Sequence, residues 1–334
     1  MSAIVKQLAL IGLGHQSRSE LVPAILKLKN KCKIIAICDI NKNFVKETLK
    51  LFPDPKKISV YGNYTDLFRD VNENKGLVLD GVVVSVPHFL YSDIVEQAVL
   101  KSVAVFKEKP FALNLEEAQK LSRLALKKGV QIYTVIKRQF YPSYATGLRL
   151  LNDGEIGKPY MYSARHFTPN GNLYDGWRST VQAAGGGVLI DMGYHLLDVI
   201  LRYFGDVSQV NFHWSNVAKP NHTYEVEDAA SLHNWHPSGV HGVFQLAALS
   251  GAKEEEIEVR GTKGKIVVTD SNLKIYDVQG SLKNTFSFKT NGIDATTEAL
   301  KQFLLNDKSI WSQNISHNMK LMRVIDMAYK RRFS

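Results

Sequence analysis

Short apolar runs alternate with helix-like stretches through the first third of this chain, and this alternation constrains the fold more than any other feature. The apolar runs are residues 8–11, 33–38, 81–86, 104–106 and 132–136, and several are rich in Val and Ile. The helix-like stretches are residues 20–29, 42–51, 64–71, 91–100 and 115–127. Asn114 and Glu117 have the spacing of a capping box before the last stretch. Parallel strands buried on both faces have such apolar runs, so the sequence predicts a doubly wound parallel sheet.

The pattern changes after about residue 138. One helix is expected over residues 142–152, and two more over residues 295–305 and 317–330. Strand-like runs with alternating or aromatic character occupy residues 160–166, 209–214, 229–235, 242–249, 256–260, 265–269 and 273–278. Turn sequences separate these runs, which predicts a largely antiparallel sheet. We therefore expect two domains, residues 1–137 and 138–334, with the last helix able to pack back on the first domain.

The bulk properties are those of an ordinary globular protein. No apolar run reaches the roughly 18 residues of a membrane-spanning helix, and the chain opens on a strand-like run rather than on a secretory signal. We therefore expect a cytoplasmic protein. Cys32 and Cys38 fall in one extended run, too far apart along it to form a bridge, so we expect two reduced core thiols.

The formal net charge of +10 favours anionic partners. The basic residues are scattered along the chain, and the densest groups lie near expected helix C-termini, where cations complement the helix dipole. No nucleic-acid recognition motif accompanies the charge. We therefore expect an anionic small molecule as partner, rather than a nucleic acid or a membrane.

A glycine-rich turn, Gly12-Leu13-Gly14, follows the first expected strand and precedes a helix. Such glycines allow a tight turn and let the backbone approach a pyrophosphate at the helix N-terminus. Ser17 stands where a third glycine is usual, and it is small enough for close packing, with a hydroxyl that could reach a phosphate. Asp39 ends the second strand, where a carboxylate accepts hydrogen bonds from the ribose and favours NAD over NADP, although Lys42 leaves NADP open. Alternatively, Asp39 only begins a turn.

Two loops at the carboxyl ends of later strands should border the same cofactor. The first contains Ser85, Pro87 and His88, with Tyr91 after it as a candidate substrate contact, although a surface loop without such a role fits equally well. The second is Glu108-Lys109-Pro110, whose lysine could donate a hydrogen bond or carry a proton in a cleft, and whose proline could be cis. The alternative is a solvated strand end. The candidate cofactor-binding residues are Gly12, Gly14, His15, Gln16, Ser17, Asp39, Ser85, Pro87, His88, Glu108 and Lys109.

The segment Gly185–Gly187 leads directly into an apolar helical pattern that runs to about Phe204. A regular helix would place Asp191 and His195 four residues apart on one face, with Asp198 three further on. Carboxylates and an imidazole beside a flexible entry suit proton transfer. The alternative is a helix N-terminus at which Asp191 complements the dipole and His195 is half-buried.

Cationic and aromatic side chains occur before this segment in the sequence. Lys137 and Arg138 follow the last strand of the first domain, and Tyr174, Trp177 and Arg178 precede the three glycines. An aromatic platform beside an arginine suits a charged sugar ring, although aromatic residues are more often core residues. The candidate substrate contacts are Tyr91, Arg138, Trp177, Arg178, Asp191 and His195. The histidines at positions 233, 236 and 241 lack a neighbouring cysteine or carboxylate at ligand spacing, so no metal is expected.

Together these motifs resemble the Gfo/Idh/MocA family of NAD(P)-dependent oxidoreductases over nearly the whole chain. The resemblance rests on Gly12 and Gly14, the loop at Pro87, Glu108-Lys109-Pro110, Arg138 with Phe140 and Pro142, the turn at residues 154–157, residues 185–198, Glu227-Asp228 and residues 261–264. Ser17 departs from the usual Gly or Ala. Tyr91 stands where many members have a histidine, and a histidine is found instead at His88.

The resemblance implies an N-terminal Rossmann domain that binds the dinucleotide and a C-terminal α/β domain with an open, mostly antiparallel sheet. That second domain would bind substrate and form the interface of a homodimer or homotetramer. The implied reaction is oxidation of a carbinol, or the reverse reduction, on a sugar, inositol or sugar nucleotide. By matching motif, Lys109 would hydrogen-bond the reacting oxygen and relay a proton, His195 would be the alternative or partner acid–base group, and Asp191 would orient substrate or imidazole.

Two other functions fit the same fold. One is a non-catalytic sensor that binds nucleotide and reports it to a partner protein. The other is a redox-neutral, glycosidase-like enzyme with a retained NAD. Because Lys109, Asp191 and His195 are all present, the sequence favours a catalytic dehydrogenase or reductase acting on CH–OH groups.

Overall fold

A computed structural model describes residues 5–71, 76–169 and 175–330 of the chain. The chain divides into two compact units. Unit 1 comprises residues 1–112, 116–135 and 292–319, and unit 2 comprises residues 113–115, 136–291 and 320–334. The main division falls between Val135 and Ile136. Helix α9 (Gly292–Leu305) and the first part of helix α10 (Lys308–Lys330) belong to unit 1, and the end of α10 belongs to unit 2.

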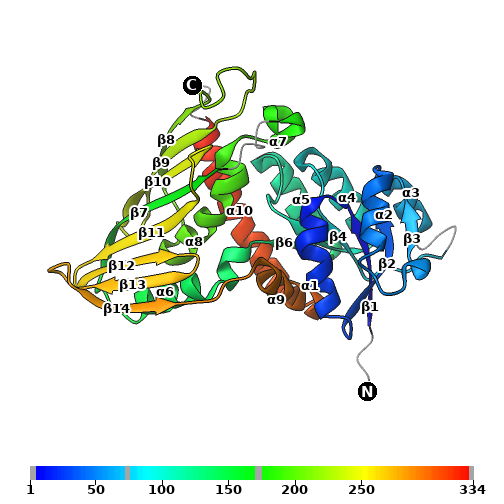
Figure 1. The fold of residues 1–334 in the computed structure, drawn as a ribbon, viewed down its shortest axis with the longest axis horizontal. Helices are drawn as coiled ribbons and strands as arrows, with labels where there is room; N and C mark the ends of the chain where they lie inside the picture. The colour runs from blue at the N-terminus through cyan, green and yellow to red at the C-terminus, as the bar shows by residue number, and fades with distance from the viewer. Residues whose placement is uncertain (1–4, 72–75, 170–174, 331–334) are drawn as a thin grey trace. The chain divides into compact units, whose positions relative to one another are not determined.

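Unit 1 contains a six-stranded parallel sheet in the order β3-β2-β1-β4-β5-β6 (Figure 1). Its strands are β1 (Lys6–Ile11), β2 (Cys32–Cys38), β3 (Ser59–Tyr61), β4 (Gly81–Val84), β5 (Ala104–Glu108) and β6 (Ile132–Val135). This is the strand order of a dinucleotide-binding fold. The strand order reverses between β1 and β4, although all the strands remain parallel. The predicted doubly wound sheet is confirmed, and only the three-residue edge strand β3 was not expected.

The crossovers of unit 1 are helical. They are α1 (Val22–Lys27), α2 (Lys42–Leu49), α3 (Tyr64–Asp70), α4 (Tyr91–Leu100) and α5 (Leu115–Lys128), and a π-helix (Ser17–Leu21) precedes α1. Asn41 caps α2, because its side chain accepts hydrogen bonds from the amides of Asn43 and Phe44. Cys32 and Cys38 are free and buried, as expected.

Unit 2 contains an eight-stranded sheet in the order β14-β13-β12-β11-β7-β10-β9-β8. Its strands are β7 (Pro159–Thr168), β8 (Gln209–Ser215), β9 (Ala229–Trp235), β10 (His241–Ala248), β11 (Glu254–Gly261), β12 (Gly264–Thr269), β13 (Asn272–Tyr276) and β14 (Leu282–Ser287). Only the β7–β10 pair is parallel, so the predicted mostly antiparallel sheet is confirmed. The outermost strand β14 was not expected.

The helices of unit 2 pack on one face of this sheet (Figure 1). They include α6 (Pro142–Asn152), which matches its predicted bounds, α7 (Val181–Ala184) and α8 (Tyr194–Phe204), with a π-helix (Leu189–Gly193) directly before α8. Buried and exposed residues alternate along β7 and β11, so the buried face packs on these helices. Residues 181–204 are long and apolar enough to span a membrane, but 83% of the apolar window is buried inside the protein, as in a core helix.

Candidate functional site

The glycine-rich turn of unit 1 has one filled and one open position. Gly12 has a φ of +83°, and a Cβ added to it would overlap the carbonyl oxygen of Ser85 at the end of β4. Its amide donates to the carbonyl of Cys38 at 2.9 Å. Gly14, in contrast, has no atom of the described residues within 4 Å of an added Cβ. The turn is therefore packed on the sheet at Gly12 and open at Gly14, where a pyrophosphate would need to approach the backbone.

Ser17 forms a side-chain hydrogen bond to the backbone of this turn. Its side chain is fully buried, and its hydroxyl donates to the carbonyl oxygen of Gly12 at 2.5 Å. The expectation that this hydroxyl reaches a phosphate is not supported, because the hydroxyl is already used within the protein. Ser17 instead gives the close helix–strand packing expected at the third glycine position, and it begins the π-helix.

Asp39 ties the second strand to the glycine-rich turn. Its Oδ2 accepts the amide of Leu13 at 2.6 Å, and its Oδ1 accepts the amide of Asn41 at 2.7 Å. The carboxylate thus begins the turn into α2, as the alternative interpretation holds, and is also fixed beside the glycines. Each oxygen retains a further lone pair, so the same carboxylate can accept ribose hydroxyls. His15 is exposed at the start of the helix.

The carboxyl end of β5 carries Glu108 and Lys109. The Glu108 side chain is nearly fully buried, and its Oε1 accepts the side-chain amide of Gln16 at 3.2 Å. This contact joins the end of β5 to the helix that follows the glycine-rich turn. Lys109 is partly exposed, and the Lys109–Pro110 peptide bond is cis. The lysine that the sequence singled out is therefore partly exposed, next to a residue whose side chain contacts Gln16.

The loop after β4 is less accessible than expected. Ser85 and Pro87 are partly exposed, but His88 is 5% exposed and Tyr91 is 2% exposed. The two rings stack with centroids 6.1 Å apart. The Tyr91 ring also contacts Lys107, whose Nζ lies 3.7 Å from the ring centroid. The prediction that Tyr91 contacts substrate needs correction, because the ring is buried within unit 1.

The three glycines of unit 2 are all in close contact with the protein itself. A Cβ added to Gly185 would lie 2.7 Å from the carbonyl oxygen of Leu113. A Cβ on Gly186 would overlap the hydroxyl of Tyr329, and one on Gly187 would overlap the Glu227 carbonyl oxygen. The glycines therefore permit close packing against three parts of unit 2.

Glu227 fixes the helix that follows these glycines. Its carbonyl accepts the amide of Val188 at 2.9 Å, and its carboxylate accepts the amide of Leu189 at 3.1 Å. Tyr329 donates to the same carboxylate oxygen at 2.7 Å. A fully buried carboxylate thus caps the helix start, where it also complements the helix dipole. Sequence reasoning gave Glu227 and Tyr329 no such role, because their partners are 38 and 102 residues distant along the chain.

The helix start itself departs from a regular α-helix. Asp191 lies in the π-helix, and His195 lies in the first turn of α8. Because a π turn is wider than an α turn, the predicted four-residue register is altered between the two side chains. Both are partly exposed. Asp198 is fully buried and accepts from Nε of Arg202 at 2.9 Å, so it belongs to the core of unit 2.

Trp177 and Arg178 lie in a short 3₁₀ helix (Gly176–Ser179). The guanidinium of Arg178 stacks on the Trp177 ring, 4.3 Å from its centroid, and its Nε lies 3.9 Å from Oδ2 of Asp191. The side chains of Arg178 and Asp191 are 40% and 18% exposed. The structure therefore brings together the predicted aromatic platform, its cation and the carboxylate of the π-helix. Tyr174 lies outside the described residues.

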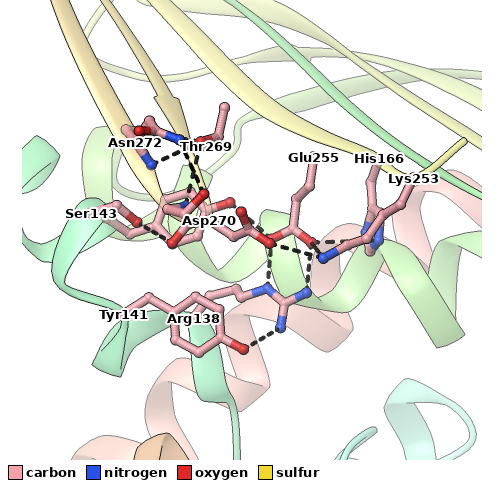
Figure 2. Close-up of polar contacts among 11 residues, drawn as sticks. Arg138, Tyr141, Ser143, His166, Lys253, Glu255, Thr269, Asp270 and Asn272 are labelled. Carbon is pink, nitrogen blue, oxygen red and sulfur yellow. Dashed lines mark hydrogen bonds and ion pairs between the residues drawn. The ribbon is translucent and has the colours of Figure 1, made fainter. Parts of the chain in front are cut away.

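Arg138 is used differently. Figure 2 shows its guanidinium against the Glu255 carboxylate, with Nε and one terminal nitrogen each donating at 2.6 Å. Tyr144 donates to the same carboxylate at 2.8 Å, and Tyr141 accepts from Arg138 at 3.4 Å. Burial acts to raise the pKa of Glu255, but Arg138 outweighs it, with help from His166, and holds that pKa at about 2. The prediction that Arg138 holds substrate is corrected, because its guanidinium is buried in a bidentate ion pair.

His166 lies on β7 beside this ion pair (Figure 2). Burial lowers the pKa of His166 to about 4, even though Glu255, 3.7 Å away, favours the charged form. The imidazole is therefore neutral at neutral pH and forms no ion pair there.

The geometry allows specific chemistry in each unit. Unit 1 offers an open glycine turn, a fixed carboxylate and a partly exposed lysine at the carboxyl edge of a parallel sheet, which is where such sheets bind ligands. Unit 2 offers a carboxylate, an imidazole and a stacked guanidinium around one helix start. Within the described ranges, no three His, Cys, Asp or Glu side chains are grouped as a metal site requires.

Comparisons with known proteins give a family match for both halves of the chain. Residues 6–136 match the model of an oxidoreductase family with an NAD-binding Rossmann fold, and residues 144–267 match the GFO/IDH/MocA C-terminal domain. Myo-inositol 2-dehydrogenase of Thermotoga maritima is 26% identical over 296 residues, which is 85% of this chain and 83% of the relative. NAD-dependent scyllo-inositol 2-dehydrogenase of Bacillus subtilis is 28% identical over 60% of this chain and 57% of its own length.

Solved structures show the same fold. Levoglucosan dehydrogenase in complex with NADH and levoglucosan matches with a TM-score of 0.83 at 16% identity. The match covers 98% of this chain and 97% of that chain.

Proposed function

Because this chain belongs to the Gfo/Idh/MocA family of NAD-dependent oxidoreductases, we propose that it transfers hydride between nicotinamide and a carbinol or ketone carbon of a sugar, inositol or sugar-nucleotide-type substrate. The observation that carries the proposal is the position of Lys109, partly exposed at the carboxyl end of β5. Through Glu108 and Gln16 this strand end is joined to the open glycine turn. An ammonium placed there can act on a substrate oxygen beside a bound dinucleotide.

The residues of unit 1 fit NAD as the bound group. Gly14 leaves room at the helix start, and the Asp39 carboxylate is held where it can accept both ribose hydroxyls. The same carboxylate would repel the 2′-phosphate of NADP. NAD, when bound, supplies the hydride acceptor, or the donor in the reverse direction.

Proton transfer is assigned to this chain's own side chains. Oxidation of a carbinol removes a hydride from carbon and a proton from oxygen, so a base must accept that proton. In this proposal Lys109 hydrogen-bonds the reacting oxygen and relays the proton. His195 is the partner or alternative acid–base group, and Asp191 orients the substrate or the imidazole.

The substrate contacts proposed for unit 2 are Trp177, Arg178, Asp191 and His195. The Trp177 ring offers a face for a sugar ring, and Arg178 stacked on it offers a cation for an acidic or phosphorylated substituent. The guanidinium is held by stacking, with Asp191 at 3.9 Å as its ion-pair partner among the described residues. We leave Arg138 and Tyr91 out of the proposed site because both are buried.

We propose that the protein is a homodimer or homotetramer formed through the C-terminal domain. We also propose that it acts in the cytoplasm, with no nucleic acid or membrane as partner. Scattered basic residues and a net charge of +10 support an anionic small molecule rather than a polymer.

The test is steady-state absorbance at the reduced-nicotinamide band with NAD(H) and NADP(H), against sugars, inositols, sugar acids, aminosugars and nucleotide-linked sugars. Turnover with one class supports the proposal and identifies the direction. Tight nucleotide binding with no turnover across the panel contradicts it, and directs attention to a sensor or to a redox-neutral enzyme with retained NAD.

Variants then test the assigned roles. Lys109→Met and His195→Ala should each lower kcat by about 10²-fold or more, as expected for loss of a proton-transfer group, and leave NADH affinity largely unchanged. Unchanged rates in both variants would refute the assignment. Fluorescence titration with NADH gives the affinity in each case.

A further inference from the structure

A second lysine lies next to the proposed catalytic segment and is fully buried. Lys107 is in the interior of β5, two residues before Lys109, with no exposed surface. Its Nζ donates to the carbonyl oxygen of Glu108 at 2.8 Å and also to the carbonyl oxygen of Pro110. The Tyr91 ring lies 3.7 Å from the same nitrogen. Two carbonyls and one aromatic face therefore surround the amine.

The two accepting carbonyls lie on either side of Lys109. One belongs to the residue before it and the other to the residue after it, so Nζ closes a small loop around the Lys109 backbone. A lysine amine has three donors, and two carbonyls with a π face are suitable partners for all three. The contact thus restrains the main chain from which the Lys109 side chain projects.

This arrangement is costly for a purely structural role. Burial lowers the pKa of Lys107 well below its ordinary value, even though the charges of Glu108 and Glu117 act to raise it. Methionine has a similar length and would fill the same space without the desolvation penalty. What the lysine adds, and a methionine would lack, is the donor to the two carbonyls on either side of Lys109.

We propose that Lys107 is a positioning residue for Lys109: its amine holds the Glu108 and Pro110 carbonyls against the Tyr91 ring and so fixes the direction of the Lys109 side chain. This inference rests on the proposed role of Lys109. It also gives a reason for Tyr91, since the ring covers the amine and in turn stacks on His88.

The test compares Lys107→Met with Lys33→Met. Lys33 lies in β2 of the same sheet, with β1 and β4 between it and β5, and it is exposed, so the control removes one positive charge away from residues 108–110. Three quantities are measured on the full chain: the thermal midpoint, amide hydrogen exchange of the peptide spanning residues 106–112, and turnover with the substrate class found in the panel.

We expect Lys107→Met to keep a thermal midpoint close to that of the parent chain, because removal of the desolvation penalty offsets the loss of the hydrogen bonds to the two carbonyls. Exchange in the 106–112 peptide should become at least about ten-fold faster, since two hydrogen bonds to a charged donor are lost. The kcat should fall by about ten-fold with KM for NADH unchanged, because the aim of Lys109 matters only in the transition state. Lys33→Met should leave all three quantities unchanged.

Unchanged exchange in folded Lys107→Met overturns the inference, whatever the activity. Faster exchange with unchanged kcat also overturns the inference, because the restraint on residues 108–110 would then have no effect on catalysis. If Lys107→Met does not fold, Tyr91→Leu replaces it: loss of the ring should accelerate exchange in the same peptide, and full protection would contradict the proposal. Failure of the proposed function is separate, since it would be seen as undiminished turnover in Lys109→Met.

Discussion

Two glycine-rich segments enter helices in this protein, and they use glycine for different purposes. In unit 1, Gly12 packs on the end of β4, but Gly14 is open to its surroundings. In unit 2, Gly185–Gly187 are all filled by the protein's own groups, from Leu113, Tyr329 and Glu227. The sequence marks close approach in both places. Only the contacts distinguish a glycine with open space beside it from a glycine packed against the protein.

The two segments also share a feature that the sequence did not predict. Each leads into a π-helix, Ser17–Leu21 in unit 1 and Leu189–Gly193 in unit 2. π turns are rare in proteins overall, but those that occur are frequently found at functional sites. In unit 2 the wider turn carries Asp191, so the residue proposed to orient substrate lies where the helix is least regular.

The largest effect should come from filling a packed position. Gly187→Ala places a Cβ onto the backbone carbonyl of Glu227, which cannot move without breaking the cap on Leu189. We expect the free energy of unfolding to fall by about 3 kcal/mol or more. Urea unfolding followed by circular dichroism gives the value, and Gly62→Ala is the matched control, since its Cβ would meet no atom within 4 Å among the described residues. Equal stability of the two variants would contradict the packing role.

The fold could be predicted well because its signals are local. Continuous apolar runs gave the parallel strands of unit 1, and the alternation in residues 229–235 and 265–269 gave antiparallel strands of unit 2. The two strands that were not expected, Ser59–Tyr61 and Leu282–Ser287, are edge strands with little buried surface. An edge strand lacks a strong apolar pattern, so its sequence resembles that of a loop.

Acid should affect unit 2 through His166, which is buried on β7 beside the Glu255 carboxylate. Its pKa is about 4 in the folded protein and 6.5 ordinarily, so between these values the unfolded chain binds a proton that the folded chain does not. Stability contributed by neutral His166 is therefore present above pH 6.5 and decreases toward pH 4, by up to about 3 kcal/mol. Glu255, with a pKa of about 2, adds a further loss below pH 4.5.

The measurement is urea unfolding from pH 7 to pH 4 for the parent chain and for His166→Gln. The substitution should remove much of the slope between pH 6.5 and 4, while His213→Gln, at an exposed position of β8, should leave it unchanged. Parallel pH profiles for His166→Gln and the parent would show that the buried imidazole is not the source.

The site was harder to predict than the fold, and its two arginines show why. Arg138 follows a strand, and Arg178 precedes a helix. Aromatic residues are near both in the sequence, so their sequence contexts are similar. Glu255, 117 residues away, removes Arg138 from any substrate role, whereas Arg178 remains stacked on its neighbour Trp177. The identity of a distant partner is a tertiary property. The local pair Trp177–Arg178 was therefore predictable, and the burial of Arg138, Tyr91 and Lys107 was not.

The open glycine should show the opposite signature to Gly187. Gly14→Ala adds a Cβ that meets no atom of the described residues, so stability should be unchanged or rise by up to about 1 kcal/mol. NADH affinity should fall by about ten-fold, because the Cβ occupies the place where the pyrophosphate approaches the helix start. NADH fluorescence titration beside thermal unfolding separates the two effects. Loss of stability without loss of affinity would place Gly14 with the packed glycines.

The smallest effect expected is a change in nucleotide preference at Asp39. Asp39→Ser keeps an acceptor for the Leu13 amide, so the glycine turn should stay in place, but the carboxylate that favours ribose hydroxyls and repels a 2′-phosphate is removed. The ratio of NADH to NADPH affinity should fall by about ten-fold, chiefly through weaker NADH binding. Asp54→Ser, in the same unit and away from the turn, controls for the loss of one negative charge. An unchanged ratio in Asp39→Ser would mean that Asp39 serves only to begin α2, and the open side of the glycine turn would then be the sole feature of unit 1 directed at the nucleotide.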